Sequence, residues 1–283
     1  MKVLIRNFYN TSRGDRMTIV PLGDVHLGNA ACDEKLFRSV VKRIEDDPDC
    51  YWFGMGDMCE FINPSDPRWD VASLASWIKM VHLGDLAKAQ KDRFLEIVEP
   101  IAPKCLGLIE GNHEGTIKKY YERDIYSDIV TGIKEAGGFD ADHQLALDYC
   151  GWLILRHYQR AEGERGGAAW STRISLHHGF VGGKLAGAKA LNMQRWLWTH
   201  DCDLAVFGHS HNASTQVEAV ESIATSGRVM HQHRIGCYGG SFMNGAEYAV
   251  RKGYFPIPKT HIEIHLRPAA HQPRDRLRVV SGL

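Results

Sequence analysis

Five short clusters of Asp, Asn, His and Gly hold the residues of this chain that could do chemistry. Each follows an apolar run that predicts a buried strand, so each is expected at a strand end. Carboxylate oxygen, amide oxygen and neutral imidazole are ligands for divalent metal ions, and five strand ends at one sheet edge would form a cation site. The clusters are Gly23-Asp24-Val25-His26, Gly56-Asp57, Gly111-Asn112-His113-Glu114, His177-His178-Gly179 and Gly208-His209-Ser210-His211.

The first and last clusters repeat one spacing of ligand types. Asp24 and His26 are two residues apart, so on an extended backbone both side chains would point the same way and reach one ion. His209 and His211 have the same spacing. Asp57 is the expected bridge, because a carboxylate has two oxygens and can bind two ions.

The two middle clusters contain residues with different expected roles. Asn112 offers an amide oxygen to the second ion. Counting from the apolar run 174–176, His177 takes the ligand position and His178 lines the substrate pocket, although the choice between them stays open. Because Asn112 faces the metal, His113 is expected to face the substrate and to donate a proton to the leaving oxygen.

The elements that must position these clusters alternate between strand and helix in the first half of the chain. The second half is richer in strands, which suggests two sheets packed face to face with helices outside. Helices are predicted over residues 33–45, 70–82 and 85–99, and a hairpin around Cys150-Gly151. No linker is evident, so residues 1–283 are expected to form a single domain, with an insertion at about 59–99 near the active-site rim.

The ordered motifs D-x-H, G-D, G-N-H-E, H and G-H-x-H, over residues 23–211, resemble those of the calcineurin-like metallophosphoesterase superfamily. The chain is most similar to its compact prokaryotic or phage-type members. This resemblance implies a four-layer α/β/β/α sandwich with two mixed β-sheets flanked by helices. It also implies two metal ions with these ligand sets: Asp24, His26, Asp57 and His211 for one ion, and Asp57, Asn112, His177 and His209 for the other.

The activity implied by the resemblance is hydrolysis of phosphate esters at a binuclear metal centre. A metal-bound hydroxide would attack phosphorus, and His113 would act as general acid, so Asp57 and His113 are the expected catalytic residues. Two manganese ions are the expected cofactor, and iron, zinc, cobalt or nickel would suit the same ligands.

A phosphodiesterase acting on a nucleotide or nucleic acid is the preferred function. The alternatives are a phosphomonoesterase or nucleotidase using the same site, and a non-catalytic interaction scaffold, which would be expected to have lost ligands. Asp57 is followed by Met58-Cys59-Glu60 instead of the protein phosphatase motif G-D-x-V-D-R-G, which disfavours that activity.

Basic and aromatic residues near the clusters are candidates for substrate contacts. Lys184, after the fourth cluster, and Lys118, on the helix after the third, are candidates for binding a substrate phosphate. Trp69 and Trp77 lie in the insertion, where they could stack on a base; core packing or a homodimer contact is the alternative.

The composition limits the class of protein. The 34 basic and 34 acidic residues balance, so no global field would attract nucleic acid or an anionic membrane. No apolar run approaches the roughly 18 residues of a membrane-spanning helix. The seven cysteines are scattered without a C-x-x-C pair, and the N-terminus lacks an apolar signal core. We therefore expect a cytoplasmic protein without a membrane partner.

Overall fold

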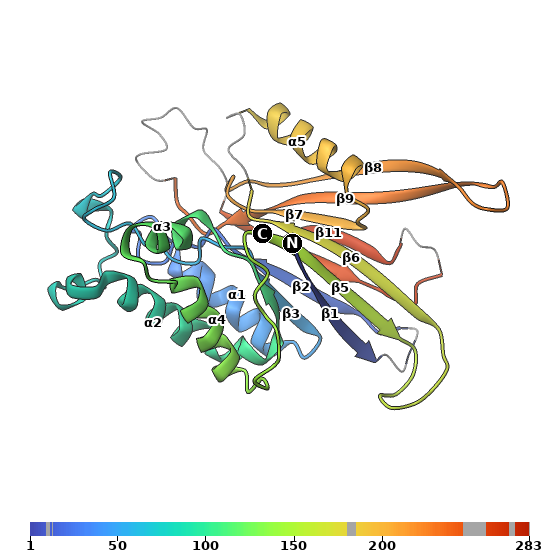
Figure 1. Ribbon diagram of the computed structural model, residues 1–283, viewed down its shortest axis with the longest axis horizontal. Coiled ribbons are helices and arrows are strands. Elements are labelled where there is room, and N and C mark those ends of the chain that lie inside the picture. The colour runs from blue at the N-terminus through green and yellow to red at the C-terminus, as the bar shows by residue number, and fades with distance from the viewer. Residues whose placement is uncertain (10–11, 13, 180–184, 246–258, 272–274, 283) are drawn as a thin grey trace.

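The computed structural model is an α/β fold with a large mixed β-sheet flanked by helices (Figure 1). It describes residues 1–9, 12, 14–179, 185–245, 259–271 and 275–282. The strands are β1 Lys2–Tyr9, β2 Met17–Leu22, β3 Cys50–Gly54, β4 Cys105–Leu108, β5 Cys150–Tyr158, β6 Ala169–His177, β7 Leu204–Phe207, β8 Ala213–Ile223, β9 Val229–Ser241, β10 Thr260–Leu266 and β11 Leu277–Gly282. The helices are α1 Glu34–Asp46, α2 Leu86–Val98, α3 Asn112–Tyr121, α4 Ile125–Ala136 and α5 Ala186–Thr199, with short 3₁₀ segments η1 Val71–Ser73, η2 Met80–Asp85 and η3 Glu99–Lys104.

The strands form one hydrogen-bonded path in the order β1-β5-β6-β7-β9-β10-β2-β3-β4. Two further strands lie off this path, β8 on β9 and β11 on β10. The long strand β9 joins the two halves, because its middle pairs with β7 and its end, Gly240 and Ser241, pairs with β10. The prediction of two separate sheets is therefore not confirmed.

Apolar side chains from the two halves of the sheet pack against each other. One buried cluster contains Leu153, Ile174 and Val206 from β5, β6 and β7 together with Ile19 and Ile264 from β2 and β10. Two other clusters join the sheet to its helices: α1, α2 and α4 pack on β2, β3 and β4, while α5 packs on β7 and β9 (Figure 1). Burial of this apolar area is the main stabilising term for such an arrangement.

The strands that precede the clusters lead them to one edge of the sheet. Strand β2 pairs in parallel with β3, and β3 with β4, so the first three clusters leave the sheet side by side. Strand β6 pairs in parallel with β7, so the last two clusters also leave together. A hydrogen bond from the N–H of Asp24 to the carbonyl of Gly56 (3.1 Å) ties the first loop to the second.

Two of the three helices predicted over stated residue ranges are present, and the helix expected after the third cluster is α3. Helices α1 and α2 begin after Asp33 and Asp85, and each carboxylate accepts a backbone N–H of the first turn at 2.9 Å. The helix predicted over residues 70–82 is wrong, because only η1 and the start of η2 form there. Met80 and Val81 are 84% and 79% exposed, so these apolar residues do not face the core.

The hairpin predicted around Cys150-Gly151 is also wrong. Cys150 is already the first residue of β5, which pairs in parallel with β1 and antiparallel with β6. The hairpin is therefore β5–β6, and its loop is residues 159–168.

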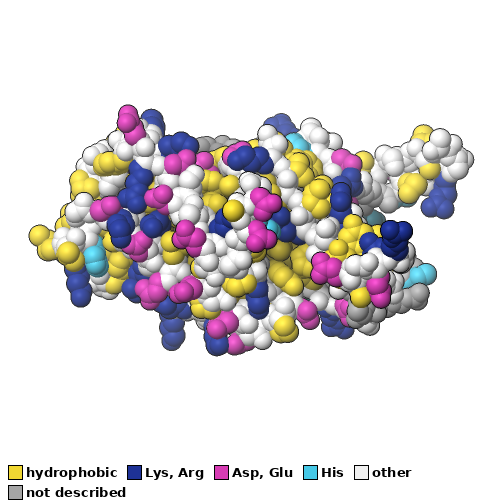
Figure 2. All heavy atoms as spheres, turned by 60° about the horizontal axis from the view of Figure 1, so that its bottom comes forward, with side chains coloured by type: hydrophobic (Ala, Val, Ile, Leu, Met, Phe, Trp, Pro, Cys, Tyr) yellow, Lys and Arg dark blue, Asp and Glu magenta, His cyan; other side chains and the backbone are white. Residues whose placement is uncertain are grey.

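The surface agrees with the balanced composition. Basic and acidic side chains are interspersed on the face drawn in Figure 2, so that face presents no continuous basic stripe of the kind that follows a nucleic-acid backbone. Within the described ranges, every helix is too short or too polar to cross a bilayer.

His157 is a buried histidine on β5. Within the described part of the chain its two ring nitrogens have no hydrogen-bond partner, and its ring stacks on Phe8 at 5.4 Å. Burial lowers the pKa of His157 to about 4. An unfolded chain would protonate this residue near its ordinary pKa of about 6.5, so the unfolded state binds more protons between these two values. Acidification through this range therefore favours unfolding.

Replacing His157 with Phe should remove this linkage. Between pH 7.5 and pH 5, His157 should cost the wild-type protein about 2 kcal/mol of unfolding free energy that the variant retains. Urea unfolding of both proteins at the two pH values measures the difference. Equal losses in the two proteins would contradict the assignment.

Candidate metal centre

Five of the predicted ligands have a strained backbone. Asp24, His26, Asp57, His209 and His211 have φ between 47° and 63°, a left-handed region that costs a non-glycine residue about 1–2 kcal/mol. Such strain persists only where surrounding contacts over-determine it, and it concentrates at functional sites. The prediction that Asp24 and His26 share one side of an extended strand is therefore wrong in its geometry. Their side chains meet because the loop turns through left-handed conformations.

Asp57 is held by the N-terminus of α3. Its Oδ1 accepts the backbone N–H of His113 at 2.9 Å. The carboxylate of Glu114 in turn accepts the backbone N–H groups of Asp57 and Gly111, each at 2.9 Å. Gly111 permits this approach, because a Cβ there would lie 2.2 Å from the backbone nitrogen of Asp57. The third cluster thus positions the carboxylate of the second.

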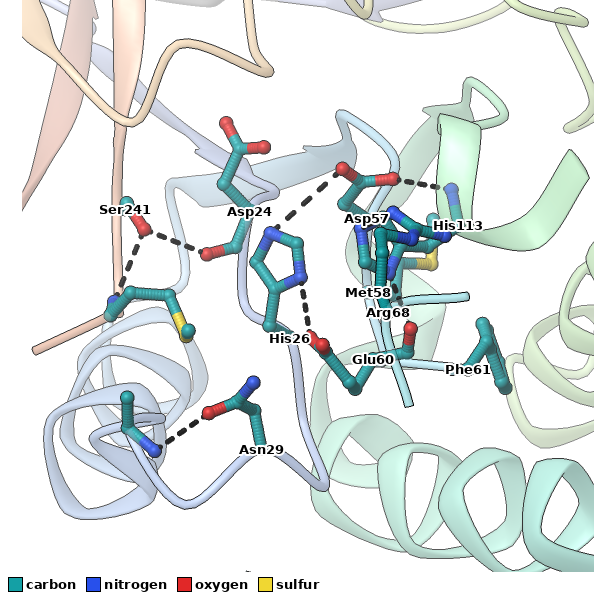
Figure 3. Close-up of polar contacts among 12 residues, drawn as sticks. Asp24, His26, Asn29, Asp57, Met58, Glu60, Phe61, Arg68, His113 and Ser241 are labelled. Atoms are coloured by element: carbon teal, nitrogen blue, oxygen red, sulfur yellow. Dashed lines mark hydrogen bonds and ion pairs between the residues drawn. The ribbon is translucent and has the colours of Figure 1, made fainter. Parts of the chain in front are cut away.

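Asp24, His26 and His211 form one group with the geometry to hold a cation. His26 Nε2 lies 3.1 Å from His211 Nε2, which lies 3.7 Å from Asp24 Oδ1. The other ring nitrogen of His26, Nδ1, donates to Glu60 Oε2 at 3.0 Å (Figure 3), so Nε2 is the nitrogen directed at the other members of the group. Two imidazole nitrogens that face each other at this distance require a proton or a cation between them.

Asp57, His178 and His209 form a second group, and Asn112 lies among them. The Nδ1 of His178 donates to a backbone carbonyl at 2.7 Å. Its Nε2 therefore faces Asp57 Oδ2 at 3.2 Å and Asn112 Oδ1 at 3.1 Å. His209 Nδ1 lies 2.8 Å from the same amide oxygen. The second group thus combines one carboxylate, one amide and two imidazoles.

The two groups fit divalent cations. Asp57 Oδ2 faces both of them, since it also lies 3.8 Å from His26 Nε2. In the protein alone, burial raises the pKa of Asp24 to about 7. Burial lowers the pKa of His178, but the charge of Asp57 and its hydrogen bond outweigh this and raise it to about 10. Both shifts mean that bound protons supply positive charge at a position where oxygen and imidazole donors suit a metal ion.

The structure places His178, and not His177, with the other candidate ligands. Strand β6 continues through His177, which pairs with a residue of β5 and a residue of β7. Alternation along this strand turns the ring of His177 toward α5, edge-on to Trp196 at 4.9 Å, and its Nδ1 accepts the N–H of Gly179 at 2.8 Å. The count from residues 174–176 ended the strand one residue too early, so His178 takes the position predicted for His177, and His177 itself packs against α5.

Glu60 is a site residue that the sequence analysis did not identify. Its carboxylate accepts from His26 Nδ1, and its backbone carbonyl accepts from His113 Nδ1. The side chain of Glu60 is 8% exposed, and the two rings meet edge to face at 4.6 Å. Its position three residues after Asp57 was the available signal, but the sequence does not show which ring an acidic residue there would contact.

His113 lies beside the candidate ligands and is 7% exposed. Its Nδ1 donates to the carbonyl of Glu60, and its Nε2 lies 3.4 Å from Nη1 of Arg68 (Figure 3). Because arginine only donates hydrogen bonds, Nε2 carries a lone pair in this arrangement. Burial also lowers the pKa of His113. A role as general acid therefore requires His113 to gain a second proton at Nε2.

The other predicted substrate contacts are those of Lys118, Lys184 and Trp77. Lys118 pairs with Asp124 at 2.7 Å and its side chain is 59% exposed, so its ammonium already has a partner. Lys184 lies outside the described residues. Trp77 packs against the helical core with Arg93 over its ring at 4.6 Å, which favours the packing alternative over base stacking.

Comparison with solved structures yields structural neighbours of low sequence identity, among them a nucleotidase and Vps29. NAD nucleotidase (NadN) of Haemophilus influenzae aligns with 94% of this chain and 49% of its own, at 8% identity and a TM-score of 0.40. Vps29 of Chaetomium thermophilum aligns with 94% of both chains, at 13% identity and a TM-score of 0.35. This chain thus spans about half the length of the nucleotidase. Neither a protein-family model nor a curated protein matches the sequence.

Substituting each of the paired histidines separately tests which of them is the ligand. His178→Ala should lower the number of tightly bound Mn²⁺ ions per chain or weaken their binding about 10-fold or more, because it removes a donor that faces Asp57 and Asn112. His177→Ala should leave metal binding unchanged and serves as the matched control. Elemental analysis of the loaded, dialysed proteins measures both. Loss of metal from the His177 variant alone would reverse the assignment.

Proposed function

We propose that this protein is a binuclear metal-dependent phosphohydrolase, with phosphodiesters as its preferred substrates. The observation that carries the proposal is the meeting of two donor groups at one atom, Asp57 Oδ2, which faces His26 Nε2 and His178 Nε2. Oxygen and imidazole donors arranged as a pair of adjacent sites are typical of two-metal hydrolases.

The ligand sets we propose share Asp57. Its Oδ1 accepts the N–H of His113, and its Oδ2 is the oxygen that faces both donor groups. Two divalent ions bound there would polarise the phosphate oxygens and supply an activated water. Manganese is the proposed ion, and iron, zinc, cobalt or nickel would suit the same donors. The sets are Asp24, His26, His211 and Asp57 for one ion, and Asp57, Asn112, His178 and His209 for the other.

Residues around the two donor groups orient the histidine rings and exclude bulk water. Glu60 fixes the tautomer of His26 so that its lone pair faces the ligand group, and it holds the ring of His113 from the main chain. His113 would take up a proton at Nε2 and pass it to the leaving oxygen. Burial of Asp24 and Asp57, each 1% exposed, keeps bulk water from competing with the donors.

The preference for diesters rests on charge. Two divalent ions would bring four positive charges to the three carboxylates Asp24, Asp57 and Glu60, and the one net positive charge that remains is balanced by a diester monoanion and exceeded by a monoester dianion. Arg68 is the cationic side chain in contact with His113, and its charge is shared with Asp66. A singly charged phosphate therefore suits these surroundings better.

The direct test is hydrolysis by the manganese-loaded protein. It should cleave bis(p-nitrophenyl) phosphate with a higher kcat/KM than p-nitrophenyl phosphate, and Asp57→Asn should lower both rates by about 10³-fold or more, since it removes the shared ligand. Release of p-nitrophenolate measures the rates. Stronger turnover of the monoester would overturn the diester preference. No turnover with any of the five metals would overturn the hydrolase itself.

His113→Ala tests the proton donor. The variant should lose about 10²-fold or more in kcat on a diester with a phenol leaving group, and less with p-nitrophenol, because the more acidic leaving group needs less protonation. Metal content should be unchanged, since His113 is not among the proposed ligands. Metal loss, or equal rate losses on the two esters, would contradict the role.

A further inference from the structure

Arg68 is a charged side chain that the insertion brings to the candidate acid. Its Nε and Nη2 donate to the two carboxylate oxygens of Asp66, at 3.0 and 2.7 Å. Asp66 also accepts the backbone N–H of Arg68 at 2.8 Å, and its own side chain is 3% exposed. This bidentate pairing holds the guanidinium in one orientation. The remaining nitrogen, Nη1, is directed at His113 Nε2 (Figure 3).

Nη1 of Arg68 has donor capacity to spare. It carries two N–H groups, and the single lone pair of His113 Nε2 can accept only one of them. No other acceptor among the described residues contacts Nη1. The Arg68 side chain is 44% exposed, so a solute can reach it. Arg68 therefore offers an oriented cationic donor beside the atom that would meet the leaving oxygen.

We propose that Arg68 binds an anionic group on the leaving side of the substrate, and that, among substrates with a singly charged scissile phosphate, phosphoanhydrides with a second phosphate as leaving group are preferred. This inference rests on the proposed function, which puts the leaving oxygen at His113. The bridging oxygen then faces His113 Nε2, and a non-bridging oxygen of the leaving phosphate faces Arg68 Nη1. An alcohol or phenol has no anionic oxygen to place there.

The reaction is a hydrolysis in which atoms and charge balance. The oxygen of water bonds to phosphorus, and the bond from phosphorus to the bridging oxygen breaks with its electron pair on the leaving phosphate. Of the two water protons, one stays with the newly formed phosphate monoester. The other ends on the leaving phosphate, delivered through His113 or solvent. Arg68 transfers no proton and acts by charge and hydrogen bonding, as a specificity-determining residue.

Two substrates that transfer the same thymidine 5′-phosphoryl group test the inference. Thymidine diphosphate glucose releases a sugar phosphate, whereas thymidine 5′-(p-nitrophenyl phosphate) releases p-nitrophenolate. Arg68→Gln should lower kcat/KM about 10²-fold on the first and less than about 3-fold on the second. Arg68→Lys should recover part of the loss. Arg38→Gln is the matched control, because Arg38 is an exposed arginine paired with Glu34 at 2.8 Å on α1.

A binding measurement separates recognition from turnover. By calorimetric titration, methylenediphosphonate should bind the manganese-loaded Arg68→Gln protein about 10-fold more weakly than the wild-type protein. Methylphosphonate binding should weaken less than about 3-fold. Equal losses of kcat/KM on both substrates would mean that Arg68 binds the scissile phosphate. Unchanged rates on both would mean that Arg68 binds neither the scissile nor the leaving phosphate. Either result overturns the inference. If the folded wild-type protein hydrolyses neither substrate with any of the five metals, the proposed function fails, and the inference fails with it.

Discussion

The buried carboxylate of Asp57 is the constraint on which the rest of the site depends. Asp24, Asp57, Glu60 and Glu114 are each 6% exposed or less, and so many carboxylates can leave water only if N–H donors, protons or cations meet them. Glu114 shows the electrostatic cost of this burial, since burial and then the charge of Asp57 raise its pKa to about 7. The N-terminus of α3 meets one oxygen of Asp57 and leaves the other for the two donor groups. The left-handed loops around it are stable because these contacts hold them.

Glu60 extends this constraint from the ligands to the candidate acid. It holds His26 by its side chain and His113 by its main chain, so the two rings cannot reorient independently. The next residue, Phe61, is itself left-handed, with φ 49°, and its N–H is held at 2.8 Å by Gln90 of α2. A helix that contains none of the five clusters therefore helps to set the geometry of two site histidines. The same stretch of chain then continues to Asp66 and Arg68, and Arg68 contacts His113.

The sequence predicted those helices that depend on interactions within a single segment of the chain. Helices α1 and α2 were predictable because their apolar faces and capping aspartates are readable within one segment. Residues 70–82 show why periodicity alone fails, since Val71, Met80 and Val81 remain exposed and no surface of the core receives them. The joining of the sheet halves was not predictable, because it depends on two residue pairs between β9 and β10 that lie about 20 residues apart in the chain.

The sequence by itself determined the donor types, their order and their positions at strand ends, because Asp, Asn and His have fixed chemistry and apolar runs mark buried strands. It did not determine at which residue β6 ends, and therefore which way His177 and His178 point. The last residue of that strand is set by hydrogen bonds to β5 and β7, and alternation then turns His177 toward α5 and His178 toward Asp57. Only the tertiary structure brought Arg68 to His113, across 45 positions of sequence, and Glu60 to His26, across 34. Such contacts depend on how loops pack after the sheet has formed, and no local pattern encodes that packing.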